Sequence, residues 1–395
     1  MKRFFSYSIL SFFLLLLPTG QASANNNDSI RLSLLTCAPG EEIYSLFGHT
    51  AIRYENSSQG IDVVFNYGLF SFNTPNFIFR FSLGETDYQL GATDYERFAA
   101  EYAFFGRSVW QQTLNLTDEE KTELIRLLQE NYRPENRVYR YNFFYDNCAT
   151  RPRDKIEESI AGKVIYPAEP QDGSLTFRDI VHQYCKGHPW ARFGIDLCIG
   201  SEADQPITQR QMMFAPFYLM DAFDGAQIKG DSIQRPLITA NELIVDATPE
   251  PDESDWMPTP LQCSLLLFIL TAAATIYGIR RRTGLWGIDL FLFGIAGIVG
   301  CVLAFLALFS QHPAVSSNFL LLVFHPGQLL FLPYIIYCVR KGKKCWYLTL
   351  NLAVLTLFIV LFPVIPQRFD FAVVPLALCL LIRSASNLIL TSKKK

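Results

Sequence analysis

The stretch LWGIDLFLFGIAGIVGCVLAFLALF, residues Leu285–Phe309, decides the architecture of the C-terminal third of the chain. It is apolar along almost its whole length. A helix rises about 1.5 Å per residue, so a segment of this length crosses a hydrocarbon core about 30 Å thick. The sequence therefore predicts a transmembrane helix here.

Four further apolar segments surround this one: Leu261–Ile279, Phe319–Val339, Trp346–Phe362 and Phe371–Leu390. The fourth span in chain order is short, and the last is interrupted by Pro375 and Arg383. Basic clusters follow the first, third and fifth spans, at Arg280–Arg282, Arg340–Lys344 and Lys393–Lys395. Because excess Lys and Arg mark the cytoplasmic side, residues 261–395 are predicted to be an all-α bundle of five transmembrane helices whose C-terminus is cytoplasmic.

The N-terminus gives an independent indication of topology. Lys2 and Arg3 precede an apolar run, Ile9–Pro18, which is followed by Ala22-Ser23-Ala24. This order is typical of a cleaved signal peptide, which we assign to residues 1–24. Residues 25–245 are then an extracytoplasmic domain, and the acidic, proline-rich residues 246–260 are a linker.

Charge limits the partners. The formal net charge is −3, without a basic stripe or a glycine-rich phosphate loop, which argues against nucleic acid as a partner. A membrane is the partner that the apolar tail predicts.

The extracytoplasmic part alternates apolar and polar residues in Ser29–Thr36 and in the segments GHTAIRYEN and GIDVVFNYG, which predicts strands and a hairpin. Helices are expected in TDYERFAAEYAFFG with Thr93 as N-cap, in the segment opened by Thr117, and in CATRPRDKIEESIAG. The expected class is α+β, with a mostly antiparallel sheet.

Cys148 stands at the start of the last of these helices. Unpaired N–H groups, the helix dipole and the nearby Arg151 and Arg153 would favour a thiolate, which is the nucleophilic form of cysteine. Pro152 disfavours helical geometry at the preceding residue, so an irregular first turn is expected. Cys148 is the candidate nucleophile.

The other cysteines have simpler interpretations. Cys37 ends an apolar strand and is expected to be a packed small residue. Cys185 and Cys198 lie in a polar stretch and are the natural disulfide pair in an oxidising compartment, although a free pair is equally compatible with the sequence.

A cysteine nucleophile needs a base, and His49 opens a predicted strand. The alternative is a strand histidine that is hydrogen-bonded in the core. His182 and His188 flank Cys185, but no paired ligand motif accompanies them, so no metal or other cofactor is predicted.

A strand histidine followed by Asn-Cys at a helix start resembles the permuted NlpC-type cysteine enzymes, which include the lecithin:retinol acyltransferase group. The resemblance implies a permuted papain-like domain with His49 as base and Cys148, preceded by Asn147, as nucleophile. Asn66 in VVFNYG stands where that group often has a second histidine to orient the first.

The segments LLTCAPGEEIYSLFGHTAIR, VFNYGLFSFNTPNF and YNFFYDNCATRPRDKI, together with the tail, resemble the Lnb lipoprotein N-acyltransferases of Bacteroides and relatives. The resemblance implies transfer of a fatty acyl chain from a membrane phospholipid to the α-amine of a lipid-modified lipoprotein. The reaction would occur at the outer, periplasmic face of the bacterial inner membrane.

Substrate contacts are expected from Asn147, Arg151, Tyr67 and His325. His325 lies within the third predicted span, where an ionisable residue is by default a functional hypothesis; the alternative is a helix–helix hydrogen bond. The aromatic run Phe143–Tyr145 is either a wall for an acyl chain or sheet core.

Two other functions fit the same residues. A membrane-anchored, NlpC-like peptidase or amidase acting on cell-wall peptides would use an identical Cys148 and His49 pair. A non-enzymatic receptor would use Cys148 structurally. The five-span tail favours a lipid substrate, since a peptidase needs only one anchor.

Overall fold

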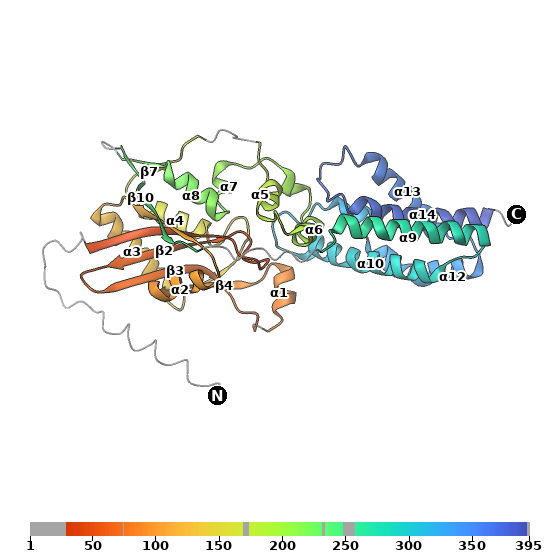
Figure 1. Ribbon diagram of the computed structural model, residues 1–395, viewed down its shortest axis with the longest axis horizontal. Coiled ribbons are helices and arrows are strands. Elements are labelled where there is room, and N and C mark those ends of the chain that lie inside the picture. The colour runs from red at the N-terminus through yellow and green to blue at the C-terminus, as the bar shows by residue number, and fades with distance from the viewer. Residues whose placement is uncertain (1–28, 74, 169–173, 231–233, 248–256, 393–395) are drawn as a thin grey trace, which may run out of the picture.

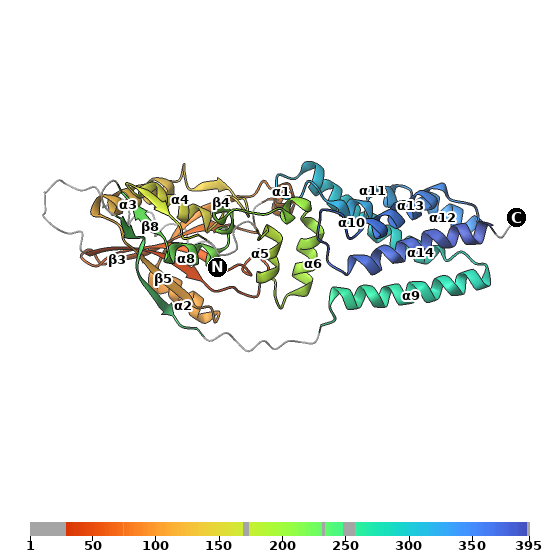
Figure 2. The same ribbon diagram turned by 90° about the horizontal axis from the view of Figure 1, so that it is seen from above.

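The computed structural model describes residues 29–73, 75–168, 174–230, 234–247 and 257–392. The expected signal peptide and most of the expected linker lie outside these residues. The described chain is elongated, with a sheet domain at one end and a helical bundle at the other (Figure 1). The C-terminus lies at the far end of the bundle (Figures 1 and 2).

Seven strands form the main sheet, in the order β10-β5-β1-β2-β3-β4-β6, and each neighbouring pair is antiparallel. The strands are β1 (Ile30–Cys37), β2 (His49–Asn56), β3 (Ile61–Leu69), β4 (Asp87–Asp94), β5 (Val109–Leu114), β6 (Val138–Arg140) and β10 (Ile238–Val245). A smaller sheet contains β7 (Lys163–Ile165), β8 (Gln227–Lys229) and β9 (Gln234–Pro236). The predicted α+β class, antiparallel sheet and β2–β3 hairpin are confirmed.

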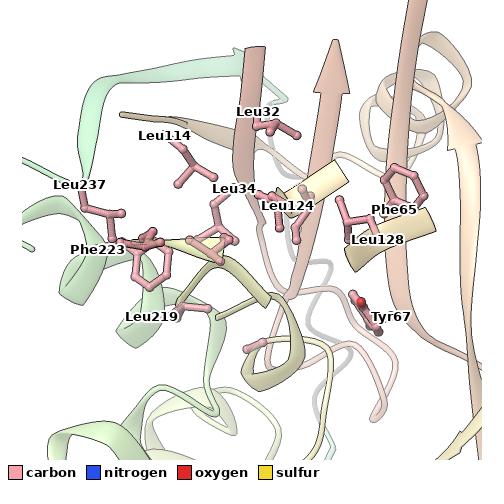
Figure 3. Packing of buried hydrophobic residues seen from close by; sticks show 14 of the residues in the cluster. Leu32, Leu34, Phe65, Tyr67, Leu114, Leu124, Leu128, Leu219, Phe223 and Leu237 are labelled. Atoms are coloured by element: carbon pink, nitrogen blue, oxygen red, sulfur yellow. The ribbon is translucent and has the colours of Figure 1, made fainter. Parts of the chain in front are cut away.

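One face of the main sheet packs on α3 (Asp118–Tyr132), α4 (Thr150–Ser159) and α8 (Pro216–Asp224). Figure 3 shows the leucine and phenylalanine side chains of this core between the strands and these helices. Each fully buried leucine contributes about 1.5–3 kcal/mol. Thr117 caps α3 in a reciprocal pair with Glu120, as the sequence predicts.

The opposite face packs on α2 (Tyr95–Phe104), whose Phe98 meets Leu35, Ala51 and Val64. The N-cap of α2 is Asp94 and not the predicted Thr93, because Thr93 still pairs with Val64 in the sheet. The strand ends that carry His49 and Asn66 thus lie between two helical layers.

The bundle has three helices long and apolar enough to span a membrane: α9 (Pro260–Arg281), α10 (Trp286–Phe309) and α14 (Val373–Ser392). The third predicted span is not one helix. It divides into η4 (Phe319–Leu322), α11 (Pro326–Leu330) and α12 (Leu332–Lys341), with a bend of 74° before α12. A proline inside a helix removes one hydrogen bond and clashes with the preceding turn, and Pro326 and Pro333 flank this bend.

The fourth predicted span is a shorter apolar helix, α13 (Trp346–Leu361). Among the residues that the structure describes there are accordingly three candidate spans, or four if the bent pair counts as one. The third and fourth expected spans are thus a bent pair and a shorter helix. Arg383 of α14 is also buried, paired with Asp289 of α10 at 2.7 Å, rather than extended toward the headgroups.

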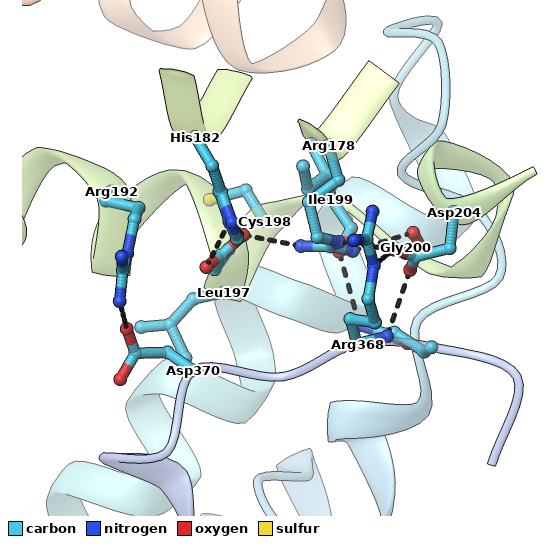
Figure 4. A network of polar contacts seen from close by, with 12 residues as sticks. Arg178, His182, Arg192, Leu197, Cys198, Ile199, Gly200, Asp204, Arg368 and Asp370 are labelled. Carbon is cyan, nitrogen blue, oxygen red and sulfur yellow. Dashed lines mark hydrogen bonds and ion pairs between the residues drawn. The ribbon is translucent and has the colours of Figure 1, made fainter. Parts of the chain in front are cut away.

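The sheet domain meets the bundle through α5 (Phe177–Tyr184) and α6 (Pro189–Cys198) (Figure 4). Arg178 is completely buried there and pairs with Asp196 at 2.6 Å and with Asp204 at 2.8 Å. Arg368, in the segment between α13 and α14, reaches the same Asp204 at 2.9 Å. Arg368 is the member of this network that joins the bundle to the sheet domain.

Three further short helices complete the chain: α1 (Phe77–Leu83), η3 (Ser201–Asp204) and α7 (Gln209–Met212).

Candidate active site

Cys148 lies two residues before the first residue of α4 and is half-buried. The backbone N–H of Thr50, the residue after His49, hydrogen-bonds to the Cys148 sulfur. On another side lies Gly68 of β3, at φ 90°, where an added Cβ would stand 3.5 Å from the Cβ of Cys148. The thiol therefore sits against the ends of β2 and β3.

The Cys148 thiol is protonated at neutral pH. Burial raises its pKa to about 11, and the N–H groups of Thr50 and of Cys148 itself offset only part of this rise. The two arginines expected to favour a thiolate are neutralised, since Arg151 pairs with Asp146 at 2.6 Å and Arg153 with Asp154 at 2.8 Å. The sequence-based expectation of a stabilised thiolate is wrong for this reason.

His49 lies at the start of β2, diagonally across from Asn66 of β3. Its Nε2 is 3.2 Å from Asn66 Oδ1. The Asn66 amide nitrogen donates to the Val64 carbonyl, so the oxygen faces the imidazole and accepts from Nε2–H. The other ring nitrogen, Nδ1, then carries the lone pair.

Burial lowers the pKa of His49 to about 4, and the positive charge of Arg107 lowers it further. The hydrogen bond to Asn66 acts in the opposite direction and is outweighed. His49 is thus a neutral imidazole at neutral pH, free to accept a proton.

Comparison with protein families now adds to this geometry. Residues 20–182 match the N-terminal periplasmic domain of Lnb, and residues 252–395 match the Lnb transmembrane domain. The chain belongs to the Lnb family. It is therefore a membrane protein with an N-terminal periplasmic domain. No curated protein and no solved structure matches the chain.

In this Lnb periplasmic domain Asn147 is 2% exposed, and both polar atoms of its side chain already make hydrogen bonds within the protein. Its Oδ1 accepts from the N–H groups of Ala149 and Thr150, while its Nδ2 donates to the carbonyls of Phe143 and Phe214. The amide has no group left for a substrate. Asn147 instead fixes the turn that carries Cys148.

Two other expected substrate contacts are also internal. The hydroxyl of Tyr67, which is 0% exposed, donates to Asn131 at 2.7 Å within the sheet core. Arg151 holds Asp146 and lies 3.5 Å above the centre of the Tyr139 ring. Burial and pairing direct both side chains inward.

His325 belongs to the transmembrane part, where it precedes α11 and hydrogen-bonds to Asn351 of α13. This contact corresponds to the helix–helix alternative. The periplasmic sheet and the bundle occupy opposite ends of the molecule (Figure 1). The structure thus places Asn66 beside His49 and the residue after His49 beside Cys148, whereas His325 lies in the bundle.

The other two histidines of the periplasmic domain, and the cysteines near them, do not join the candidate site. Cys185 and Cys198 are both free thiols, so the disulfide does not form. His182 binds the Asp196 carboxylate at 2.9 Å, and His188 lies 3.8 Å from Glu41. Phe144 of the aromatic run is 4% exposed and stacks on Phe177, which makes it core rather than the wall of an acyl site.

No sequence pattern marks Tyr139 as a site residue. Its hydroxyl is buried and has no hydrogen-bond partner among the described residues. Burial raises its pKa, and the charge of a Cys148 thiolate would raise it further, which places the two groups close together. The Thr50 hydroxyl is likewise buried and unpaired among the described residues. Unpaired buried hydroxyls are rare, and each calls for a ligand group or a water molecule.

Proposed function

We propose that this protein is a cysteine acyltransferase that moves a fatty acyl chain from a membrane phospholipid to the α-amine of diacylglyceryl-Cys lipoproteins. One observation carries the proposal. The Cys148 sulfur accepts a hydrogen bond from the backbone N–H of Thr50, the residue after His49, and Asn66 orients the His49 imidazole. The Lnb resemblance supplies the substrate class, and the permuted NlpC-like arrangement of His and Cys supplies the roles.

In the first half-reaction, the neutral thiol attacks the carbonyl carbon of a phospholipid ester. His49 Nδ1 takes the thiol proton as the S–C bond forms. The C–O bond of the ester then breaks, and the same proton passes to the departing lysophospholipid oxygen. The acyl chain is left on Cys148 as a thioester.

In the second half-reaction, the α-amine of the lipid-modified cysteine attacks the thioester carbonyl. A C–N bond forms and the C–S bond breaks. His49 removes one proton from the amine and returns it to the Cys148 sulfur. The products are an amide on the lipoprotein and the original thiol, so no cofactor is consumed.

Both tetrahedral intermediates carry an oxyanion that needs hydrogen-bond donors. The N–H groups of Ala149 and Thr150 cannot serve, because Asn147 already occupies them. We propose two donors: the unpaired Tyr139 hydroxyl, and the Thr50 N–H, which contacts the Cys148 sulfur at rest and would turn to the oxyanion once that sulfur has bonded to carbon. A reacting carbonyl would give both groups the acceptor that suits them.

Both substrates are anchored in lipid, which explains why a periplasmic domain should be fixed to a membrane bundle. Arg368 pairs with Asp179 and Asp204 and so joins the two parts. We propose that the protein resides in the inner membrane, with the C-terminus of the bundle in the cytoplasm, following the distribution of Lys and Arg. The shorter α13 and the bent α11–α12 pair would complete a five-segment bundle.

The test is mass spectrometry of lipoprotein N-termini from cells that express wild type, Cys148→Ala or Cys37→Ala. Cys37 is a matched control because it is 0% exposed and lies opposite His49 in the sheet. We expect the third acyl chain to disappear only with Cys148→Ala. An unchanged third acyl chain in that variant would refute the proposal, and altered cell-wall peptides in its place would favour the peptidase.

A further inference from the structure

The helix α1 is unusual because none of its residues is buried. Ile78 is 80% exposed and Phe79 59% exposed, and Phe72, just before the helix, is 66% exposed. Exposed apolar side chains are ordinary when scattered, but a contiguous group marks an interaction surface. We call residues 70–73 and 75–83 the aromatic arm.

Two polar side chains of the aromatic arm, Arg80 and Ser82, are held by the protein itself. Arg80 pairs with Asp87 at 2.7 Å and donates to the Glu85 carbonyl. The Ser82 hydroxyl donates to the Ile78 carbonyl within the helix. The outward face is therefore left to Ile78 and to the phenylalanines, with no charge directed toward a partner.

The aromatic arm is fixed to the outer end of the transmembrane span α10. The Gln311 N–H donates to the Leu83 carbonyl at 2.8 Å, and His312 Nε2 donates to the Phe81 carbonyl at 2.6 Å. Gly84 packs so closely here that an added Cβ would stand 2.9 Å from the His312 nitrogen. In Figures 1 and 2, α1 lies on the side of the sheet domain that faces the bundle.

The depth of the arm follows from one ring contact. The Phe79 ring lies 6.0 Å from the ring of Phe305, which is one turn inside the end of α10 at Phe309. One helical turn corresponds to about 5.4 Å along the axis. Phe79 thus extends below the outer end of a membrane span, where its exposed face continues the lipid-facing surface of α10.

A series of ring contacts leads from Phe81 of the arm toward Cys148. The ring of Phe81 meets Phe77 at 6.0 Å, and Phe77 stacks on Phe70 at 5.7 Å. Phe70 then meets Tyr88 at 5.0 Å.

The series ends beside the thiol. Tyr88 stacks on Tyr141 at 4.1 Å. A Cβ at Gly68 would touch both the Tyr141 ring, at 3.9 Å, and Cys148, at 3.5 Å. We call these five rings, from Phe81 to Tyr141, the aromatic track.

We propose that the aromatic arm inserts into the outer leaflet of the membrane and that the aromatic track leads one fatty acyl chain of a membrane lipid from there to Cys148. The first half of this proposal needs only the exposed surface and its contact with α10. The second half rests on the proposed acyl transfer. The occupant is a fatty acyl chain because the arm continues a lipid-facing surface and offers no charge to a headgroup or an acidic protein.

The first half is tested with the full-length protein in nanodiscs that contain a phospholipid with a diazirine on its acyl chain. After illumination, adducts are mapped by peptide mass spectrometry. We expect adducts in the aromatic arm as well as on the spans. The double variant Ile78→Ser, Phe79→Ser should lower adducts in the arm at least about tenfold, since each loses the burial of a large apolar side chain.

The matched control is Ile165→Ser, at an exposed apolar residue of β7 far from the bundle (Figure 1), which should change nothing. Adducts on α9, α10 and α14 without any in the arm would overturn membrane insertion. Protein–protein adducts that join two copies through the arm would also overturn it, in favour of a self-association surface.

The second half is tested by the rate at which Cys148 becomes acylated, measured on the intact protein by mass spectrometry. The donors are long-chain phospholipid in nanodiscs and a short, water-soluble acetyl thioester. Phe77→Ser should slow acylation by the phospholipid about tenfold, because a water-exposed hydroxyl replaces an apolar contact. It should leave the acetyl reaction unchanged, whereas equal loss with both donors would overturn the track.

The outcomes separate the two proposals. If neither donor acylates Cys148 in the wild type, the proposed function fails, while lipid adducts in the aromatic arm still decide whether the arm contacts the membrane. If Cys148 is acylated normally in Phe77→Ser by both donors, the function stands and the track is refuted.

Discussion

The His49 imidazole and the Asn66 amide lie diagonally on neighbouring strands and are joined at 3.2 Å. Because the Asn66 oxygen accepts from Nε2–H, the bond leaves Nδ1 as the basic nitrogen. The same bond favours the protonated imidazole, yet burial outweighs it and lowers the pKa of His49 to about 4. The base is therefore available over the whole neutral range.

Replacing Asn66 by Asp should change the pH dependence of acyl transfer. A carboxylate beside His49 favours the imidazolium and raises its pKa. Activity in the wild type should persist down to about pH 4 to 5. In Asn66→Asp, the acid limb of the pH–activity profile should move toward neutral pH. The measurement is kcat/KM against pH, which reports the free enzyme.

Asn66→Ala is the control for this prediction. It removes the orienting bond without adding charge, so activity should fall about tenfold or more at every pH while the limb stays at acidic pH. Coincident acid limbs in wild type and Asn66→Asp would show that His49 is not the group that titrates.

The thiol of Cys148 should react slowly with iodoacetamide at neutral pH. Its pKa of about 11 leaves little thiolate, and alkylation should accelerate about tenfold per pH unit between pH 7 and 10. His49→Gln should leave the alkylation rate at pH 7 nearly unchanged, since Cys148 and His49 are both uncharged at rest. The same variant should abolish acyl transfer. A plateau with a midpoint below pH 8 that His49→Gln removes would instead indicate a thiolate–imidazolium pair.

Much of the fold follows from local pattern. The alternation in β1 to β3 and the Thr117 cap of α3 involve neighbours in sequence, so the sequence predicted them. The residue types of the candidate site were also predictable, because few histidines and cysteines occur in the periplasmic domain. What the sequence concealed are contacts between distant residues.

The protonation of Cys148 illustrates this limit. Arg151 and Arg153 stand close to it in sequence and suggest a positive environment, but each is paired with a carboxylate. Burial against strands that are far from Cys148 in sequence then decides the pKa of its thiol. In the same way, only the fold reveals that Arg383 faces Asp289; the break of the third span, by contrast, was readable from Pro326 and Pro333.

Tyr139 and Tyr67 make a matched pair for the oxyanion hypothesis. Tyr139→Phe removes a buried hydroxyl without a partner among the described residues, so stability should be unchanged or slightly higher. Thioester formation should slow about 10²-fold, the usual effect of losing one oxyanion donor.

Tyr67→Phe should show the opposite pattern. It loses the bond to Asn131 and about 1 kcal/mol of stability, with acylation intact. Thermal unfolding and the rate of thioester formation measure the two effects. Equal acylation rates in Tyr139→Phe and wild type would remove Tyr139 from the site.

The stability of the periplasmic domain should depend far more on Arg178 than on Arg368. Arg178 is 0% exposed and faces two buried carboxylates, Asp196 and Asp204. Removing it as Arg178→Met leaves Asp196 with only His182 and Asp204 with only the half-exposed Arg368, and breaking a buried pair in this way costs about 3–5 kcal/mol.

Arg368 is 49% exposed at its side chain, and Asp204 keeps Arg178 when Arg368 is lost. Arg368→Met should cost about 1 kcal/mol or less, because solvent screens its pairs. Thermal unfolding of the full-length protein in detergent compares the two variants. A smaller loss of stability in Arg178→Met than in Arg368→Met would show that the buried carboxylates take up protons or find other partners.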